Sequence, residues 1–166
     1  MFIDGDDFLY NNNCLQILYN YYLKTNSDVI IYKMIKYDTF KNMYIKINVP
    51  KFSWNSNNLA IGYSSACGKI IKQNIIEYFL EGCDHAADTY QHLKILNHHP
   101  NILDINDIIY VYRKNLNSVT FNGNYKKDTA LFYYHLNELC KICTEPNVKK
   151  SILHRFKLYN LGKIDT

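Results

Sequence analysis

Short apolar runs alternate with segments of helical periodicity along this chain, and no other feature limits its fold as strongly. The runs DVIIYKMI and IIYVY are rich in β-branched and aromatic residues, which favour buried strands. We expect strands at residues 1–5, 28–35, 43–49, 59–66 and 108–112, and a weaker one at 118–121. Apolar residues recur at helical spacing in the segments 13–24, 69–82, 83–96, 129–143 and 151–161. This alternation predicts an α/β fold with a largely parallel sheet.

The length and composition are those of a single globular domain. The 166 residues suffice for one core, and we expect one domain over residues 1–166 in which residues 128–166 form a helical C-terminal part. No apolar run approaches the roughly 20 residues of a membrane span, and the first residues lack the pattern of a secretory signal. We therefore expect a cytoplasmic protein whose five cysteines are reduced.

Two groups of aspartates stand beside the expected elements. FIDGDDFLY places Asp4, Asp6 and Asp7 directly after the first apolar run, and CDHAAD places Asp84 and Asp88 on one face at the start of a helix. Ligands bind at the carboxyl ends of strands in open α/β sheets, so both groups are expected at one edge. Carboxylates gathered in this way bind Mg²⁺ or Mn²⁺. The alternative is that Asp4 lies in a polar turn and Asp84 caps a helix.

The same two segments resemble motifs of the PIN-like nucleases, in particular of their NYN branch. FIDGDDFLY is similar to the first strand of that family with its D-G-D-N sequence. CDHAADTYQHL is similar to the central motif, in which an Asp follows small residues and opens an amphipathic helix. The run IIYVY fits the strand that comes next, so the resemblance covers residues 1 to about 115.

This resemblance implies a three-layer α/β/α domain with a mainly parallel central sheet, and metal-dependent hydrolysis of RNA or single-stranded nucleic acid. In that interpretation Asp4 and Asp88 are the catalytic metal ligands, Asp7 takes the place of the family's Asn, and Asp84 assists. The cation would be Mg²⁺ or Mn²⁺. The expected contacts to nucleic acid are Arg113, Lys114, Lys126 and Lys127.

One segment departs from the family pattern. The family carries a Ser-x-Asp type segment after its fourth strand, whereas YVYRKNLNS offers Arg113, Lys114 and Asn115 and no acid. Cations beside a metal site compete with the metal. Either catalysis uses fewer acids, or the domain has lost catalysis and only binds.

Two other functions share these residues. The spacing of Asp4, Asp6, Asp84 and Asp88 also resembles the haloacid dehalogenase phosphatases, in which Asp4 would be the nucleophile. The non-enzymatic alternative is a viral structural protein that assembles with copies of itself, because paired tyrosines on helices leave one ring of each pair exposed. The abundance of Asn, Ile, Lys and Tyr is typical of an AT-rich genome, and a virus or a parasite as the source fits this composition. For a virus, the expected location is inside an infected host cell.

We do not expect zinc. His135, Cys140, Cys143 and His154 provide a single Cys-x-x-Cys pair, which lies on an expected helix and lacks a knuckle glycine. Cysteines in such a position commonly pack as small apolar side chains.

Overall fold

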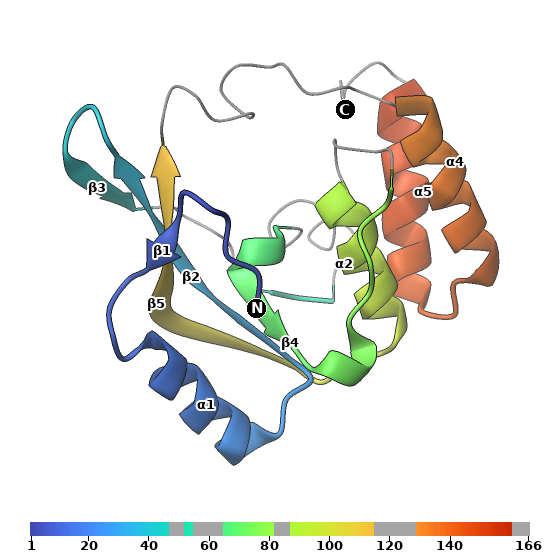
Figure 1. Cartoon of the computed structure of the whole chain (residues 1–166). Coiled ribbons are helices and arrows are strands. Elements are labelled where there is room, and N and C mark those ends of the chain that lie inside the picture. Colours follow the sequence, from blue (N-terminus) through green and yellow to red (C-terminus); the bar gives the residue numbers. More distant parts are fainter. Residues whose placement is uncertain (47–51, 55–64, 82–86, 115–128, 161–166) are drawn as a thin grey trace. The chain divides into compact units, whose positions relative to one another are not determined.

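The computed structural model describes residues 1–46, 52–54, 65–81, 87–114 and 129–160 (Figure 1). The chain divides into two compact units. The first contains a β-sheet and one long helix, and it consists of Met1–Lys51, Ala66–Asn74 and Asn101–Asn124. The second contains the other long helices, and it consists of Phe52–Ser65, Ile75–Pro100 and Tyr125–Thr166. The expectation of one domain stays a prediction.

Five strands form the sheet of the first unit (Figure 1). They are β1 (Phe8–Leu9), β2 (Val29–Asp38), β3 (Met43–Lys46), β4 (Lys69–Ile71) and β5 (Ile102–Lys114). The order is β1-β5-β2-β3, and β4 also pairs with β2. Only β2 and β5 run parallel among the described pairs, whereas β1 with β5, β2 with β3, and β2 with β4 are antiparallel. The α/β class is confirmed with a mixed sheet, and the expectation of a mainly parallel sheet is wrong.

A tight turn after β2 explains part of this difference. The side chain of Asp38 is buried, and its Oδ1 accepts hydrogen bonds from the backbone N–H groups of Phe40 (3.0 Å) and Lys41 (3.2 Å). Such an Asp-stabilised turn reverses the chain within a few residues. Strands joined by so short a connection pair antiparallel, because a parallel pair needs a crossover of a dozen or more residues.

The first strand of the sheet begins later in the chain than the sequence pattern predicts. Residues 1–5 are not a strand, although Met1 and Phe2 pack against the core. The short strand β1 follows the aspartates instead of preceding them. The expected strand at 43–49 is confirmed over Met43–Lys46, and the rest of it lies outside the described residues. Most of the expected strand at 59–66, and all of that at 118–121, lie outside them as well.

The segment that follows Gly68 is a strand and not the expected helix. Lys69–Ile71 forms β4, and its three residues pair with Val29–Ile31 of β2. The 3-10 turns η1 (Ala66–Gly68) and η2 (Gln73–Ile75) flank it. The β-branched side chains of Ile70 and Ile71 suit a pleated sheet, and pairing with a buried strand outweighs a local helical spacing.

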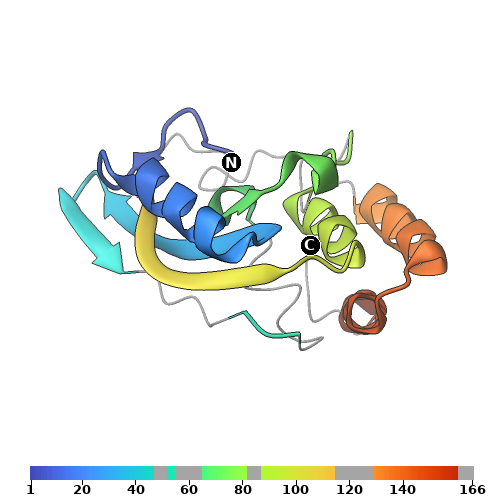
Figure 2. The same cartoon turned by 90° about the horizontal axis from the view of Figure 1, so that it is seen from below.

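Helix α1 (Cys14–Thr25) packs on the sheet and confirms the helix expected at 13–24 (Figure 2). Cys14 and Leu18 are buried in the same apolar cluster as Ile30 of β2 and Ile109 of β5. Strand β5 is longer than the expected 108–112 and bends, because its pairing with β2 shifts register between Ile31 and Met34. The bend is bonded to α1, since the hydroxyl of Tyr21 donates to Oδ2 of Asp107 (2.9 Å).

The second unit contains three long helices that contact one another. They are α2 (Ala87–Asn97), α4 (Thr129–Ile142) and α5 (Pro146–Asn160). Leu93, Leu136 and Ile152 are buried, one from each helix. The expected helices are confirmed over residues 87–96, 129–142 and 151–160, whereas α5 begins earlier than expected, at Pro146. None of the helices in the described part of the chain has the length and apolarity needed to cross a bilayer.

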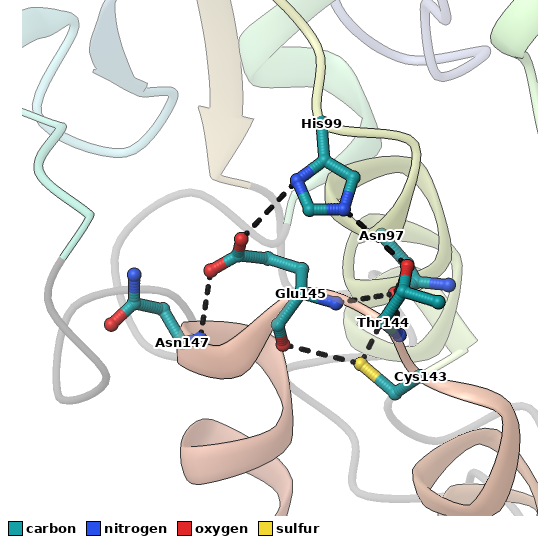
Figure 3. A network of polar contacts seen from close by, with 6 residues as sticks. All are labelled: Asn97, His99, Cys143, Thr144, Glu145 and Asn147. Carbon is teal, nitrogen blue, oxygen red and sulfur yellow. Dashed lines mark hydrogen bonds and ion pairs between the residues drawn. The ribbon is translucent and has the colours of Figure 1, made fainter.

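A network of polar contacts joins the end of α2 to the start of α5 (Figure 3). Oδ1 of Asn97 accepts hydrogen bonds from the backbone N–H groups of Thr144 (2.9 Å) and Glu145 (3.1 Å). Glu145 in turn accepts the N–H of Asn147 on its carboxylate (2.7 Å), which satisfies a donor in the first turn of α5. His99 lies beside this carboxylate, with Nδ1 3.3 Å from Oε2.

Candidate functional site

The aspartates of FIDGDDFLY lie in a tight turn directly before β1. The backbone N–H of Asp7 donates to the carbonyl oxygen of Asp4 (3.1 Å), which closes the turn. Asp4, Gly5 and Asp6 are exposed, whereas Asp7 is half-buried. A Cβ added at Gly5 would meet no atom within 4 Å, so the space beside this residue is open. The turn therefore presents two carboxylates, Asp4 and Asp6, on either side of an unobstructed backbone.

Strand β5 holds the turn through two residues. The hydroxyl of Tyr110, whose side chain is fully buried, donates to Oδ2 of Asp7 (2.6 Å) and accepts the backbone N–H of Asp4 (3.1 Å). The backbone N–H of Arg113 donates to Oδ1 of Asp7 (2.7 Å). Both carboxylate oxygens of Asp7 thus accept hydrogen bonds from β5, and the turn is fixed at both ends.

The carboxylates of the turn act on one another electrostatically. Burial raises the pKa of Asp7 above its usual value, and the negative charges of Asp6 and Asp4 raise it further. The bonds from Tyr110 and Arg113 lower the pKa of Asp7 but do not cancel these effects. Burial, together with the bond to Asp7, raises the pKa of Tyr110, so its hydroxyl keeps its proton and remains a donor. A cation at the turn would relieve this repulsion.

The remaining predicted ligands are not part of this turn. Asp88 lies in the first turn of α2, within the second unit, and it is half-buried. Asp84 lies outside the described residues. The described residues contain no group of three or more His, Cys, Asp or Glu side chains able to hold a metal. The ligand set of Asp4, Asp7, Asp84 and Asp88 therefore stays a prediction.

The basic residues expected to contact nucleic acid have other neighbours here. The guanidinium of Arg113 lies over the ring of Phe8, 5.4 Å from its centroid. Nζ of Lys114 lies 3.5 Å from Oδ2 of Asp38. Lys126 and Lys127 lie outside the described residues. The first two side chains are thus engaged within the sheet unit.

The residues considered for zinc have contacts of their own. The thiol of Cys143 donates to Oδ1 of Asn97 (3.1 Å), and burial raises the pKa of this thiol. The ring of His135 contacts the rings of Tyr90 and Tyr134.

Sequence reasoning missed Tyr110 as a residue of the site. The sequence pattern places Tyr110 only in a buried apolar strand, IIYVY. The available signal was its hydroxyl, because a tyrosine inside a buried run needs a hydrogen-bond partner. The sequence does not show which partner, since Asp4 and Asp7 are more than 100 residues away.

The fold has known counterparts among solved structures. The chain is similar to the crystal structure of S. aureus TarS 1–349 in complex with UDP-GlcNAc, with a TM-score of 0.65 and 19% sequence identity. That match covers 98% of this chain and 48% of the TarS chain. A second crystal structure of S. aureus TarS 1–349 matches with a TM-score of 0.60 and 18% identity, over 98% of this chain and 46% of that one.

The fold resembles that of TarS. A crystal structure titled S. aureus TarS matches as well, with a TM-score of 0.58 and 17% identity, over 95% of this chain and 27% of that one. The chain thus spans less than half the length of the TarS structures. No family model matches the chain. No curated protein matches it either.

These findings correct the expected family. The fold resembles that of the TarS structures and is not that of a PIN-like or NYN nuclease. The resemblance gave the wrong family because a D-G-D sequence next to an apolar run indicates only that acidic residues lie beside a buried segment. Such a motif does not indicate the directions of the strands. In the PIN-like interpretation the acidic residues should lie at the end of a parallel strand. Here they precede a short antiparallel one.

The predicted nuclease function and the predicted nucleic-acid partner are wrong together with the predicted family. The TarS structure was solved with a sugar nucleotide and not with nucleic acid, so a nuclease that binds RNA or single-stranded nucleic acid is wrong for this chain. The phosphatase and the self-assembling structural protein are not supported either. The three TarS structures named above are from a bacterium, and they lend no support to a viral source.

Proposed function

We propose that this chain carries part of the active site of a glycosyltransferase that uses a sugar nucleotide as its donor. Two observations support this proposal together: the likeness to TarS, which has been solved with UDP-GlcNAc, and the exposed carboxylates of the Asp4–Asp7 turn. The second observation carries the proposal, because it provides the chemistry that such a donor needs. A cytoplasmic location remains a prediction from the sequence.

A sugar nucleotide and a pair of aspartates repel one another. The diphosphate of the donor is negatively charged, so Asp4 and Asp6 can bind it only through a divalent cation. Protein-bound Mg²⁺ typically has one or two carboxylate ligands and completes its coordination with water and substrate phosphates. Two exposed carboxylates beside open space at Gly5 fit that requirement without a third protein ligand. We assign Mg²⁺ or Mn²⁺ to Asp4 and Asp6.

The chemistry then divides between the cation and the protein. When bound, the cation would supply positive charge against the diphosphate that leaves the sugar. The turn would orient the diphosphate, because its backbone is fixed by Tyr110 and Arg113. The acceptor hydroxyl must lose a proton as it attacks the sugar, and a carboxylate is a suitable base.

The test is a calorimetric titration of the purified chain with UDP-GlcNAc, carried out once with Mn²⁺ and once with EDTA, which measures the affinity for UDP-GlcNAc. We expect binding only with Mn²⁺, and a loss of affinity of about tenfold or more in Asp4→Asn and in Asp6→Asn. The matched control is Asp104→Asn, because Asp104 pairs with Lys33 away from the turn and should leave the affinity unchanged.

Two results would contradict the proposal. One is equal binding in Mn²⁺ and EDTA by the wild type and both turn variants. The other is no binding of any nucleoside-diphosphate sugar tested.

A further inference from the structure

The structure assigns Tyr110 as the positioning residue of the acidic turn: its hydroxyl directs Asp7 into the protein and so presents Asp4 and Asp6 to a divalent cation. This inference rests on the cation site of the proposed function, although its central experiment does not require the sugar nucleotide. It also gives Asp7 a supporting role in place of direct ligation.

The first step is the bonding capacity of the hydroxyl. A tyrosine hydroxyl has one proton to donate and two lone pairs with which to accept. The proton of Tyr110 goes to Oδ2 of Asp7 (2.6 Å), and one lone pair accepts the backbone N–H of Asp4 (3.1 Å). One buried atom therefore bridges the first and last residues of the turn.

The second step is that Asp7 has both oxygens engaged by β5. Oδ1 accepts the N–H of Arg113 (2.7 Å), while Oδ2 accepts the Tyr110 hydroxyl. Charge-assisted bonds of this kind are short and strong, so the carboxylate is oriented toward the strand. Asp4 and Asp6, in contrast, are exposed. The turn thus separates one inward carboxylate from two outward ones.

The third step is the rigidity of the support. Tyr110 is fully buried in the apolar cluster that also contains Ile30 and Cys14, and this packing holds its ring in place. Residues that orient metal ligands from behind commonly contribute 10- to 100-fold to metal affinity. Loss of the hydroxyl should leave the ring of Tyr110 packed in the core but remove its hydrogen bonds to the turn. The carboxylates of the turn would then be less well oriented to bind a cation.

The test measures the affinity for Mn²⁺ alone, by the loss of the free-ion electron paramagnetic resonance signal. Tyr110→Phe should weaken Mn²⁺ binding about tenfold relative to the wild type. Tyr32→Phe is the matched control, since Tyr32 is buried in the same cluster and its hydroxyl donates to the carbonyl oxygen of Cys67 (2.6 Å). It should lose a similar amount of stability and keep wild-type Mn²⁺ affinity.

A double substitution tests whether the hydroxyl acts through Asp7. In an Asp7→Asn background, Tyr110→Phe should cost much less Mn²⁺ affinity than in the wild type, because the bond between the two side chains is already altered. An equal loss of Mn²⁺ affinity from Tyr110→Phe in both backgrounds would overturn the inference. So would wild-type Mn²⁺ affinity in Tyr110→Phe, or an equal loss of Mn²⁺ affinity in Tyr32→Phe and Tyr110→Phe. The absence of any Mn²⁺ binding by the wild type would overturn it as well.

The same variants separate this inference from the proposed function. If Mn²⁺ binding depends on Tyr110 but UDP-GlcNAc never binds, the positioning role stands and the glycosyltransferase proposal fails. If UDP-GlcNAc binds with Mn²⁺ to the wild type and equally to Tyr110→Phe, the proposed function stands and the positioning role fails.

Discussion

At the scale of single residues, Asp28 shows how one carboxylate joins segments that are distant in the sequence. Its Oδ1 lies 2.9 Å from Nζ of Lys72, and its Oδ2 accepts the backbone N–H of Asn101 (2.9 Å). Asp28 precedes β2, Lys72 follows β4 and Asn101 precedes β5. The bond from Lys72, and then that from Asn101, lower the pKa of Asp28 below its usual value of 3.8.

We predict that Asp28→Asn lowers the free energy of unfolding by about 1 kcal/mol at pH 7, a value kept small because the ion pair is partly exposed. A carboxylate with a lowered pKa in the folded state stabilises above its unfolded pKa, and this contribution is lost as the pH falls through the folded value. The difference between variant and wild type should therefore shrink below about pH 4. Urea unfolding at several pH values measures it.

The control for this experiment is Glu138→Gln, which removes an exposed ion pair with Lys141. It should change the free energy of unfolding by less than about 0.5 kcal/mol at every pH. A cost of Asp28→Asn that stays constant down to pH 3 would show that the charge of Asp28 is not the source of its contribution.

At the scale of elements, the connection between α4 and α5 depends on a residue from α2. Asn97 is the last residue of α2, and its Oδ1 accepts the N–H groups of Thr144 and Glu145 and the thiol of Cys143 (Figure 3). Glu145 precedes Pro146, which begins α5, and its carbonyl accepts the N–H of Lys149. Proline suits this first position, since its missing N–H would have no helical partner. One amide oxygen thus fixes where α5 begins.

Removal of this oxygen should loosen the second unit. Asn97→Ala is expected to lower the free energy of unfolding by about 1–3 kcal/mol, because two backbone donors lose their partner. Asn97→Asp retains an acceptor and should recover most of the loss. Thermal unfolding followed by circular dichroism measures both, with Asn20→Ala on the exposed face of α1 as the control. Equal losses in the Ala and Asp variants would refute this role of the oxygen.

Element by element, the sequence predicted helices better than strands. Segments such as 13–24 and 129–143 carry enough apolar positions at helical spacing to identify a helix locally. The strand β4 has three residues and was assigned to a helix, because so short a segment has no periodicity of its own. Its structure comes from its pairing with β2, and the sequence does not show which segments will meet.

At the scale of the whole molecule, ligand binding should rigidify two stretches of the first unit that are far apart in the sequence. The acidic turn and the second half of β5 are bonded to each other, so a cation and UDP-GlcNAc held by the turn should rigidify both. A ligand that binds only the folded state stabilises it by about 2.7 kcal/mol at 100 times its dissociation constant.

We predict slower amide hydrogen exchange at residues 4–9 and 110–113 when Mn²⁺ and UDP-GlcNAc are added together. Mn²⁺ with UDP-GlcNAc and excess EDTA should restore the exchange rates of the free protein. Mass spectrometry of peptic fragments measures the effect, with peptides from α4 as an internal reference. Protection confined to α4 and α5 would place the ligand elsewhere.

The sequence by itself determined the α/β class, the long helices and the grouping of Asp4, Asp6 and Asp7 in one short segment, because periodicity and carboxylate clustering are local properties. Only the tertiary structure decided the strand directions, the inward orientation of Asp7 and the part played by Tyr110. Those features arise where β5 meets a turn more than 100 residues earlier in the chain. Such contacts depend on which buried surfaces pack together, and packing is a property of the whole folded chain.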